Sequence, residues 1–428
     1  MLLPMKKILS ISSILILLVA FLVTSYSRDK DFLLSDDLNR SDAAVFKGAK
    51  TGEYVLSDIE QLGKAIFFDK ISIPNNTSCA DCHEPEYGFT GPDSGQNLVS
   101  GIYRGAVSKR TSNRKPPSAA YATFSPVFYY DEIEGLFVGG NFWDGRATGE
   151  KLGNPAADQA LGPFLNPVEQ NMPDAKSVLM HIANAKYVDL WEVVWGEKIS
   201  FERLIDVEIN YDRVGWAIAA YEASAEVNQF SSKYDYYLEG KVSLTEEEEL
   251  GLELFNGKAM CSACHPSEPG PYAANTLFTD FTFDNLGTPR NPDNPFYKMD
   301  MVYLDDGTAI NPEGMDWIDP GLGGFLENMP EWADMAAENM GKYKVPTLRN
   351  VAKKSGPGSV KAYMHNGVFK SLKEVVHFYN TRDVEPWPEP EVDENINTDE
   401  LGDLGLTEAE EDAIMAFMET LSDGYKIQ

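Results

Sequence analysis

The sequence predicts a mainly α-helical protein in which two similar domains follow one another in tandem, with long irregular loops around them. Three observations lead to this fold class. A short cysteine–histidine motif occurs twice, a similar helical segment precedes each copy, and no run of alternating apolar and polar residues predicts a sheet. The length of 428 residues is enough for two or three domains of ordinary size. A composition of 43% hydrophobic and 11% aromatic residues excludes a disordered chain.

The chain carries a large excess of acidic residues, with 67 Asp and Glu against 36 Lys and Arg, which gives a formal net charge of −31. A nucleic-acid-binding protein needs basic residues to displace counterions from phosphates, so this charge argues against DNA and RNA as partners. It also argues against binding to anionic membrane surfaces. Small solutes or a cationic protein are the partners that such a charge favours.

The N-terminus has the order of segments found in a secretory signal. Lys6 and Lys7 precede an apolar run over 8–23, and small and polar residues follow over 24–27. This order predicts a Sec-type signal peptide over residues 1–27, a linker over 28–56, and a periplasmic or otherwise exported protein. The apolar run is long for a signal and short for a membrane-spanning helix, so an uncleaved anchor is the alternative.

All four cysteines of the chain belong to two Cys-x-x-Cys-His motifs: Cys79, Cys82 and His83 in the first, and Cys261, Cys264 and His265 in the second. This is the attachment motif of c-type haem. Its two thiols form thioether bonds to the haem vinyl groups, and its imidazole becomes the proximal ligand of the iron. Zinc sites and disulfides are the alternatives, but a zinc site usually takes a further ligand pair, and a redox Cys-x-x-Cys does not require the histidine. The motifs therefore predict two covalently bound haem c groups.

A similar segment precedes each haem motif. Residues 62–69 and 250–257 share Leu, Gly, an aliphatic residue and Phe at equal offsets. Capping boxes that start at Ser57 and Thr245 predict that each segment is a short helix leading into its motif. The repeat predicts two cytochrome-c-like domains, over 57–240 and 241–428.

Further helices and loops complete the predicted fold. Apolar residues at helical spacing predict a helix over 211–227, and a last helix is capped by Thr407 and can end at Gly424. The stretch 266–340 is rich in Pro, Gly, Asn and Asp, which indicates a long irregular insertion or a loop over the second haem. Residues 385–403 are acidic and rich in proline, and are predicted to be a surface loop or a linker.

The sequence resembles a known family, the bacterial dihaem cytochrome c peroxidases and their relative MauG. The resemblance covers about residues 58–424. Besides the two haem motifs, it rests on short segments that occur in the family's order: 142–147 (FWDGRA), 158–160 (DQA), Pro163, 166–169 (NPVE), 221–222 (YE), 345–350 (VPTLRN), 363–367 (YMHNG) and 372–376 (LKEVV).

The resemblance implies an N-terminal, peroxidatic domain that reduces hydrogen peroxide and a C-terminal, electron-transfer domain. Glu169 falls on the family's distal acid–base and Gln159 on its distal glutamine. Burial in a haem pocket would raise the pKa of Glu169, which suits a group that moves a proton between the peroxide oxygens. Trp143 falls on the tryptophan between the haems and would relay electrons. A solvated surface Glu and a core Trp are the ordinary alternatives.

Two departures from the family pattern concern the iron ligands. In relatives that need reductive activation, a histidine after the first haem motif ligates the first iron, but this chain has no histidine between Glu84 and Met180. Unless His181 reaches back, the first iron, bound by His83, is expected to keep an open sixth position, as in MauG-like members.

The second departure concerns the ligand opposite His265. Typical peroxidases have a Met there, whereas this chain has Tyr379, as MauG-like members do. A phenolate stabilises oxidised iron and lowers its potential. His377 and Met364 are rival ligands, and His365 is expected to support this haem by hydrogen bonding.

The family also binds calcium between the haems through an Asn side chain and two backbone carbonyls. Asn113 is the expected side-chain ligand, and 360–362 is the expected carbonyl segment. Carbonyl ligands do not require particular side chains, so an oxygen site for a hard cation is compatible with this sequence.

Three functions follow from this reasoning. The leading one is an exported dihaem peroxidase that takes electrons from a donor protein, such as a small cytochrome c or a cupredoxin. The second is a MauG-like enzyme that uses peroxide-derived high-valent iron to oxidise residues of a partner protein, and both departures favour it. The third is a non-enzymatic electron-transfer cytochrome, which would need both irons six-coordinate. A homodimer is compatible with the family.

Overall fold

The computed structural model describes residues 54–304 and 306–427. These residues fall within one compact unit. The predicted signal peptide and most of the predicted linker lie outside the described residues.

Among the helices of the described residues, none has the length and apolarity required to cross a bilayer.

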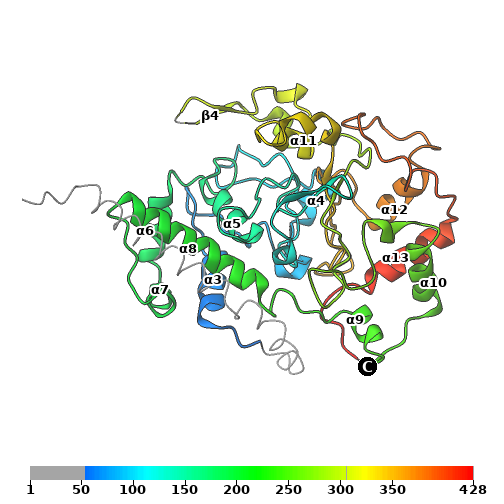
Figure 1. The fold of residues 1–428 in the computed structure, drawn as a ribbon, viewed down its shortest axis with the longest axis horizontal. Coiled ribbons are helices and arrows are strands. Elements are labelled where there is room, and N and C mark those ends of the chain that lie inside the picture. Colours follow the sequence, from blue (N-terminus) through cyan, green and yellow to red (C-terminus); the bar gives the residue numbers. More distant parts are fainter. Residues whose placement is uncertain (1–53, 305, 428) are drawn as a thin grey trace, which may run out of the picture. The chain divides into compact units, whose positions relative to one another are not determined.

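The described chain is mainly helical, as the sequence predicts, and Figure 1 shows the arrangement of its elements. The α-helices are α3 (Asp58–Phe68), α4 (Ser94–Val99), α5 (Pro155–Leu165), α6 (Ala175–Ala183), α7 (Val188–Trp195), α8 (Leu204–Ala223), α9 (Lys233–Leu238), α10 (Glu246–Asn256), α11 (Gly321–Leu326), α12 (Leu372–Thr381) and α13 (Glu408–Glu419). Single 3-10 turns are η2 (Pro85–Tyr87), η3 (Ala122–Phe124), η4 (Cys261–Ala263), η5 (Pro295–Lys298), η6 (Gly314–Asp316), η7 (Ala333–Met335) and η8 (Ala337–Asn339).

The strands form three short antiparallel pairs within the described residues. The pairs are β1 (Tyr129–Asp131) with β2 (Leu136–Val138), β3 (Phe283–Asp284) with β6 (Tyr343–Lys344), and β4 (Val302–Tyr303) with β5 (Ala309–Ile310). The β3–β6 pair joins segments that are about sixty residues apart in sequence, and it lies next to the functional site described below.

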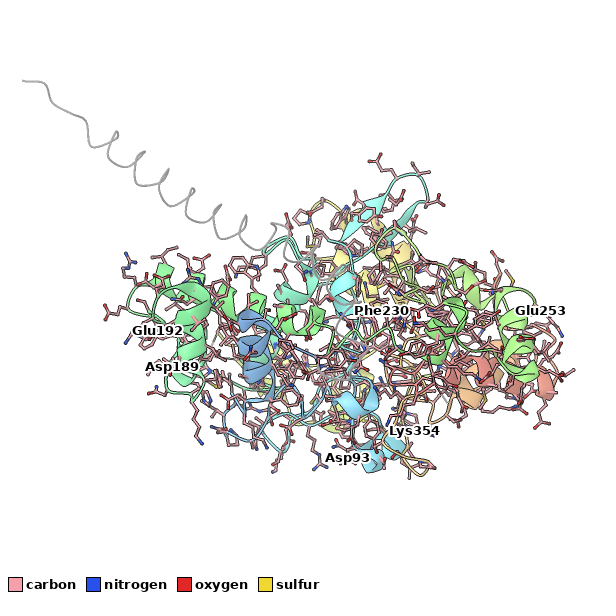
Figure 2. The ribbon with its side chains drawn as sticks, turned by 90° about the horizontal axis from the view of Figure 1, so that it is seen from below. Asp93, Asp189, Glu192, Phe230, Glu253 and Lys354 are labelled. Carbon is pink, nitrogen blue, oxygen red and sulfur yellow. The ribbon has the colours of Figure 1, made fainter. Side chains whose placement is uncertain are left out.

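The helices fall into two groups (Figure 1). In the first group α3, α5 and α6 pack on α8, and α7 packs on α3. In the second group α10 and α12 pack on α13. Figure 2 labels exposed acids of both groups: Asp189 and Glu192 lie near each other on α7, and Glu253 of α10 lies far from both. Each group contains the helix that leads into one haem motif.

The repeat seen in the sequence recurs in how these helices cross. A Cβ atom added at Gly63 of α3 would lie 1.8 Å from the carbonyl oxygen of Ala217 on α8. A Cβ atom added at Gly251 of α10 would lie 1.9 Å from the carbonyl oxygen of Ala413 on α13. Both crossings therefore bring backbone against backbone, and only glycine allows this approach.

Aromatic rings pack beside both crossings in the same way. The ring of Phe67 meets that of Tyr221 edge to face, with centroids 5.4 Å apart. The ring of Phe255 meets that of Phe417 edge to face, with centroids 5.1 Å apart. The two helix pairs thus share one packing pattern, which supports the predicted duplication, while the domain boundaries at 240 and 241 stay a prediction.

Two predicted helices differ in length from the observed ones. The helix expected over 211–227 is α8, which begins earlier because Asp206 accepts a hydrogen bond from the backbone N–H of Arg203 at 3.3 Å. Most residues in its second half are buried, so an amphipathic stripe underestimates its extent. The last helix, α13, ends at Glu419 rather than near Gly424. The stretch 266–340 contains only short elements, as predicted.

A buried ion pair connects elements on either side of the second haem motif. Arg349 forms a bidentate pair with Asp235 of α9, with distances of 2.7 and 3.0 Å, and its Nε atom donates to the carbonyl oxygen of Thr276. The guanidinium also lies over the ring of Tyr121, 5.0 Å from its centroid. Arg349 belongs to the VPTLRN segment, so this part of the motif has a packing role.

Candidate functional site

The first haem motif borders a cavity of about 180 Å³. Cys79, Cys82 and His83 line it. Helix α5 contributes Gln159 and Pro163, and Glu169 follows from the next loop. The structure therefore brings the predicted proximal histidine, the predicted distal acid and the predicted distal amide to one cavity.

Helix α5 positions Gln159 because its start is well determined. The side chain of Asn154 accepts hydrogen bonds from the backbone N–H groups of Ala156 and Ala157, at 2.8 and 3.2 Å. Pro155 occupies the first turn, where its missing N–H costs nothing. The helix ends soon after Pro163, so both cavity-lining residues sit on one short, capped element.

Each motif histidine is held in the same manner. The Nδ1 atom of His83 lies 3.0 Å from the carbonyl oxygen of Phe89, and that of His265 lies 2.8 Å from the carbonyl oxygen of Phe278. A carbonyl only accepts hydrogen bonds, so Nδ1 carries the proton and Nε2 keeps a free lone pair. Burial lowers the pKa of both imidazoles, that of His265 to about 4. Both rings are therefore neutral and suited to bind iron.

Glu169 has the electrostatic environment that the sequence analysis predicts. Burial raises the pKa of its carboxyl. Arg146 and hydrogen bonds with Asn166 and Ser112 act in the opposite direction, because they stabilise the carboxylate. A carboxyl whose pKa is raised in this way is protonated more readily than an exposed one, which suits a group that accepts and returns a proton.

Trp143 lies between the two haem motifs, since it lines the cavities of both. Its indole Nε1–H donates a hydrogen bond of 2.7 Å to the backbone carbonyl of Lys115, and only 9% of the residue is exposed. The next residue, Asp144, is bound by Arg114 at 2.6 Å and by Arg146 at 2.7 Å. These contacts hold the indole in one orientation between the cavities.

The second haem motif borders a cavity of similar volume, about 180 Å³. Besides the motif residues, Tyr379, Met364 and His365 line it. Tyr379 projects from α12, and burial raises the pKa of its phenol, with the cysteine thiols adding to the effect. Tyr379 therefore lies beside the two thiols of the second motif and faces the same cavity.

His365 is fixed by aromatic contacts. Its ring stacks on that of Tyr343, with centroids 3.4 Å apart and an angle of 11° between the planes. It also meets the Trp143 ring edge on, with centroids 6.5 Å apart. Its Nε2 atom lies 3.6 Å from Glu391. His365 therefore connects the indole to the wall of the second cavity.

The other two histidines do not line either cavity. His181 lies 3.0 Å from Asp69, so it does not reach the first cavity, in which His83 is the sole histidine among the described lining residues. His377 of α12 lies 2.9 Å from Glu411 and faces away from the second cavity. The geometry thus removes His377 as a rival of Tyr379 and leaves Met364.

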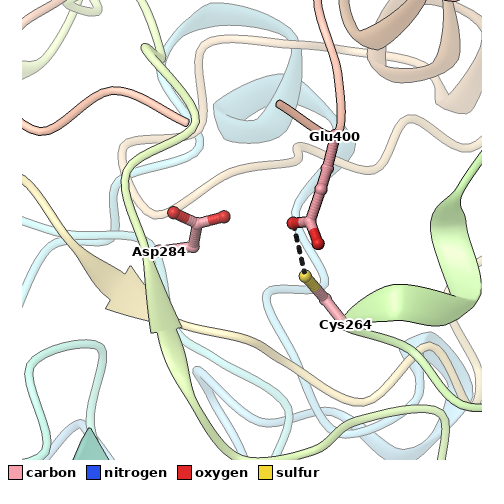
Figure 3. A group of neighbouring side chains, drawn as sticks. All are labelled: Cys264, Asp284 and Glu400. Atoms are coloured by element: carbon pink, nitrogen blue, oxygen red, sulfur yellow. Dashed lines mark hydrogen bonds between the residues drawn. The ribbon is translucent and has the colours of Figure 1, made fainter. Parts of the chain in front are cut away.

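Two carboxylates lie beside Cys264, and the sequence analysis missed them (Figure 3). The Sγ atom of Cys264 lies 3.8 Å from an oxygen of Glu400, and Asp284 completes the group. Asn397 donates to Asp284 at 2.6 Å and to Glu400 at 2.8 Å. Glu400 lies 136 residues after Cys264, so no motif could have indicated that they meet. As carboxylates they would favour the oxidised, more positive form of an iron held at the second site.

Comparisons with known proteins point to the same site. The sequence profile described as "Di-haem cytochrome c peroxidase" matches residues 57–243. Methylamine utilization protein MauG of Paracoccus denitrificans is 35% identical over 377 residues, which span 85% of this chain and 88% of that protein. The chain belongs to the dihaem cytochrome c peroxidase and MauG family.

Other members extend the comparison. Cytochrome-c peroxidase IdrP2 of Denitromonas iodatirespirans is 27% identical over 384 residues, which span 87% of this chain and 83% of that protein. The crystal structure of the diheme peroxidase BthA from Burkholderia thailandensis has a TM-score of 0.70 and 28% identity, and the match covers 88% of each chain. The protein is therefore a peroxidase-like oxidoreductase with two haem cofactors, as the sequence predicts.

The two cavities fit haem. Each holds two thiols and a neutral imidazole with a free Nε2 atom. The thiols are not joined in disulfides, and burial raises the pKa of both Cys82 and Cys261 to about 12. Thiols with such high pKa values are poor thiolate nucleophiles, which argues against a redox Cys-x-x-Cys. His83 and His265 would hold the two irons.

The calcium that the family resemblance implies does not fit the residues present. Asn113 lines the first cavity, but the carbonyl oxygen of Val360 already accepts a hydrogen bond of 3.0 Å from Asn97. In the expected carbonyl segment, Lys361 directs its side chain inward and donates to three backbone carbonyls. The segment that the resemblance expects to supply carbonyl ligands therefore carries a buried lysine of its own.

The segment 343–346 is a second feature that the sequence analysis did not identify. Lys344 lines both cavities, and its Nζ atom donates to Ser125 and to the carbonyl oxygens of Gly139 and Gly140. Burial lowers the pKa of Lys344 to about 7. The backbone N–H of Lys344 also donates to the carbonyl oxygen of Trp143 at 2.8 Å. This segment holds the indole between the cavities.

Proposed function

We propose that the protein reduces hydrogen peroxide at the first haem, with His83 as the proximal ligand and Glu169 as the acid–base. The observation that supports this most is the content of the first cavity, which has one histidine and the buried carboxyls of Glu169 and Glu222 among its described residues. When bound, the first haem would supply an iron with an open position for peroxide. The overall reaction takes two electrons and two protons and converts one peroxide molecule into two water molecules.

Glu169 moves the proton in this proposal. As a carboxylate it accepts the proton from the peroxide oxygen that binds at the iron, and as an acid it returns the proton to the departing oxygen. Its raised pKa makes the protonated form easier to reach than in an exposed carboxyl. Gln159, from α5, orients the peroxide by hydrogen bonding. The side chains of Asn166 and Ser112 keep the carboxyl directed at the cavity.

Trp143 connects the two sites in this proposal. Because its indole lines both cavities, electrons can pass between the sites through it. On the side of the second site, the ring of His365 contacts the indole, and the ring of Tyr343 stacks on that of His365. These contacts restrict the motion of the indole. A donor protein, such as a small cytochrome c or a cupredoxin, supplies the two electrons.

A second candidate function is supported by Tyr379. The phenol lines the second cavity, in the place that the family resemblance gives to the ligand opposite His265. A hard anionic oxygen ligand stabilises oxidised iron. A second site of this kind is suited to store oxidising equivalents, which would then be used on residues of a partner protein. The enzyme would in that case modify a protein, and peroxide would be its oxidant.

Stopped-flow spectroscopy of the ferric enzyme tests the proposal. We expect hydrogen peroxide to change the ferric spectrum promptly, without prior reduction of either haem. In Glu169→Gln the rate constant of this change should fall by about 10²–10⁴, the range typical of a lost acid–base group. Glu150→Gln is the matched control, because Glu150 is exposed and lies outside the cavity.

Each result has a distinct meaning. An equal rate in wild type and Glu169→Gln would remove Glu169 from the mechanism. Reaction only after one haem has been reduced would mean that a sixth ligand blocks the first iron. No reaction in either state would leave electron transfer without catalysis as the function. A long-lived oxidised product that decays faster when a partner protein is added would favour the second candidate.

Export and covalent attachment belong to the same proposal. The pairs of free thiols that line each cavity support thioether bonds to both haems. Mass spectrometry of the protein from its native host tests both points. We expect the mass to rise by two haem groups and to fall by the signal peptide over 1–27, and an unmodified, full-length chain would contradict the proposal.

A further inference from the structure

We infer that the ammonium groups of Lys361 and Lys115 replace a structural calcium ion in this protein, so that the cation between the two haem sites is part of the chain itself.

Lys361 has the surroundings of a bound cation. Its side-chain nitrogen lies 3.0 Å from the carbonyl oxygen of Tyr87, 2.7 Å from that of Asn350 and 3.3 Å from that of Lys353. Only 7% of the residue is exposed. Three acceptors around one nitrogen require three N–H donors, which an ammonium has and a neutral amine lacks.

The three carbonyls come from two parts of the chain, Tyr87 and the segment 350–353. Tyr87 follows the first haem motif, and Asn350 belongs to the segment that is joined to the end of α13 by a hydrogen bond to Leu421. Lys361 itself lies just before Met364 and His365, which line the second cavity. The ammonium therefore connects the loop that follows the first haem motif to the segment that leads to the second cavity. A bridging metal ion would make a connection of this kind.

Lys115 supplies a second buried cation close by. Its Nζ atom lies 3.0 Å from the hydroxyl of Thr90 and 3.1 Å from the carbonyl oxygen of Pro116. Its backbone accepts from the Trp143 indole and donates to the carbonyl oxygen of His365 at 2.7 Å. The backbone of Lys115 is therefore hydrogen-bonded to Trp143, which lines both cavities, and to His365, which lines the second cavity.

The buried side chains of Lys361 and Lys115 disfavour the binding of a divalent cation near them. Lys361 and Lys115 are both buried and lie close enough to interact electrostatically. No carboxylate pairs with either ammonium in the part of the chain that the structure describes. Calcium prefers six to eight oxygen ligands that include carboxylates. Here it would meet two positive charges and carbonyl oxygens that already accept hydrogen bonds.

Metal analysis of the intact enzyme with both haems is the first test. The enzyme is treated with EGTA, desalted, and examined by elemental analysis, thermal unfolding and ferric absorption, with and without added calcium chloride. We expect less than stoichiometric calcium before treatment and unchanged unfolding and spectra afterwards. Calcium at one ion per chain, whose removal lowers the melting temperature or changes the spectrum, would overturn the inference.

A pair of lysine variants is the second test. Lys361→Met keeps the apolar stem of the side chain but leaves three buried carbonyls without their donor. We expect its Tm to fall by several degrees, whereas the control Lys354→Met, an exposed lysine of the same loop that Figure 2 labels, should unfold like wild type. Equal melting temperatures in Lys361→Met and Lys354→Met would refute the role of Lys361. If Lys361→Met does not fold, the calcium content of the wild type still decides.

Discussion

At the scale of single residues, the surroundings of a side chain determine its chemistry more than its type does. The chain has 67 acidic residues, and Glu169 differs from an exposed one because burial raises its pKa inside a cavity that also holds His83. Tyr379 differs from an exposed tyrosine because it lines the second cavity beside the thiols of Cys261 and Cys264, where burial raises the pKa of its phenol. Both residues were identified from motif context, and the structure places each at a cavity.

A substitution at Tyr379 tests the ligand assignment at the second haem. A phenolate stabilises oxidised iron, so Tyr379→Met should raise the reduction potential of this haem by on the order of 0.1 V, since axial ligands set haem potentials over about 0.8 V. Spectroelectrochemical titration of the purified variant measures the shift. Tyr363→Phe is the matched control, because Tyr363 lines the same cavity but donates its hydroxyl to the carbonyl oxygen of Val351. A potential that moves as much in Tyr363→Phe would contradict ligation by Tyr379.

At the scale of elements, the two helix crossings are the parts of the fold that tolerate the least change. Gly63 of α3 and Gly251 of α10 touch carbonyl oxygens of the partner helices, so an added methyl group would force the helices apart. Each crossing lies directly before a haem motif. A shift of either helix would therefore displace the thiols and the histidine that follow it.

Alanine at either glycine should destabilise the protein. Overpacking a close contact costs about 1–3 kcal/mol, and we expect Gly63→Ala and Gly251→Ala each to lose an amount in this range. Chemical denaturation of the enzyme with both haems gives the free energy of unfolding. Gly270→Ala is the control, since a Cβ atom there meets nothing within 4 Å, and this change should be neutral or stabilise by about 0.4–1 kcal/mol. Equal stability in all three variants would show that the crossings can relax.

The contact between α12 and α13 should depend on pH. His377 of α12 lies 2.9 Å from Glu411 of α13, which raises the pKa of the histidine. A raised histidine pKa adds stability that is fully present below the unfolded pKa of about 6.5 and is lost as the pH rises through the folded pKa. His377→Gln should therefore lower Tm at about pH 6 and match wild type at about pH 9. A difference in Tm that is the same at both pH values would mean that packing, not charge, links the helices.

At the scale of the whole molecule, the net charge of the chain affects which electron-donor proteins are attracted to it. With a net charge of −31, the chain attracts cationic proteins and repels anionic ones. Buried cations such as Lys344 and Lys361 change little of this long-range field. Acidic side chains such as Asp189, Glu192 and Glu253 lie at the surface of both helix groups (Figure 2).

Turnover with a basic small cytochrome should therefore fall as salt rises. The Debye length shrinks from about 30 Å at 0.01 M to about 3 Å at 1 M ionic strength, so attraction at a distance is lost. We expect kcat/KM for the basic donor to fall by about tenfold or more across this range. An uncharged small reductant is the control and should show little change. A basic donor that turns over equally fast at high salt would exclude electrostatic steering.

The sequence by itself determined the local chemistry of this protein. The two Cys-x-x-Cys-His motifs, the capped helices before them and the loop-rich stretch 266–340 are all readable because each depends on residues that are neighbours along the chain. The family segments then indicated Glu169, Gln159 and Trp143, and the structure brings all three to the first cavity. The lengths of α8 and α13 were predicted less well, because burial on several sides obscures the amphipathic pattern that predicts where a helix ends.

Only the tertiary structure decided which distant residues meet. The lysines 115, 344 and 361, the carboxylates beside Cys264, and the stack of Tyr343 on His365 bring together segments that are separated by dozens to hundreds of residues. Such contacts depend on how two helix groups pack, and packing follows from the shape of the whole core rather than from any short pattern. For the same reason the surroundings of Lys361 could not be predicted from the sequence. Its carbonyl acceptors come from Tyr87 and from the segment 350–353, and only the fold shows that these two segments meet at this side chain.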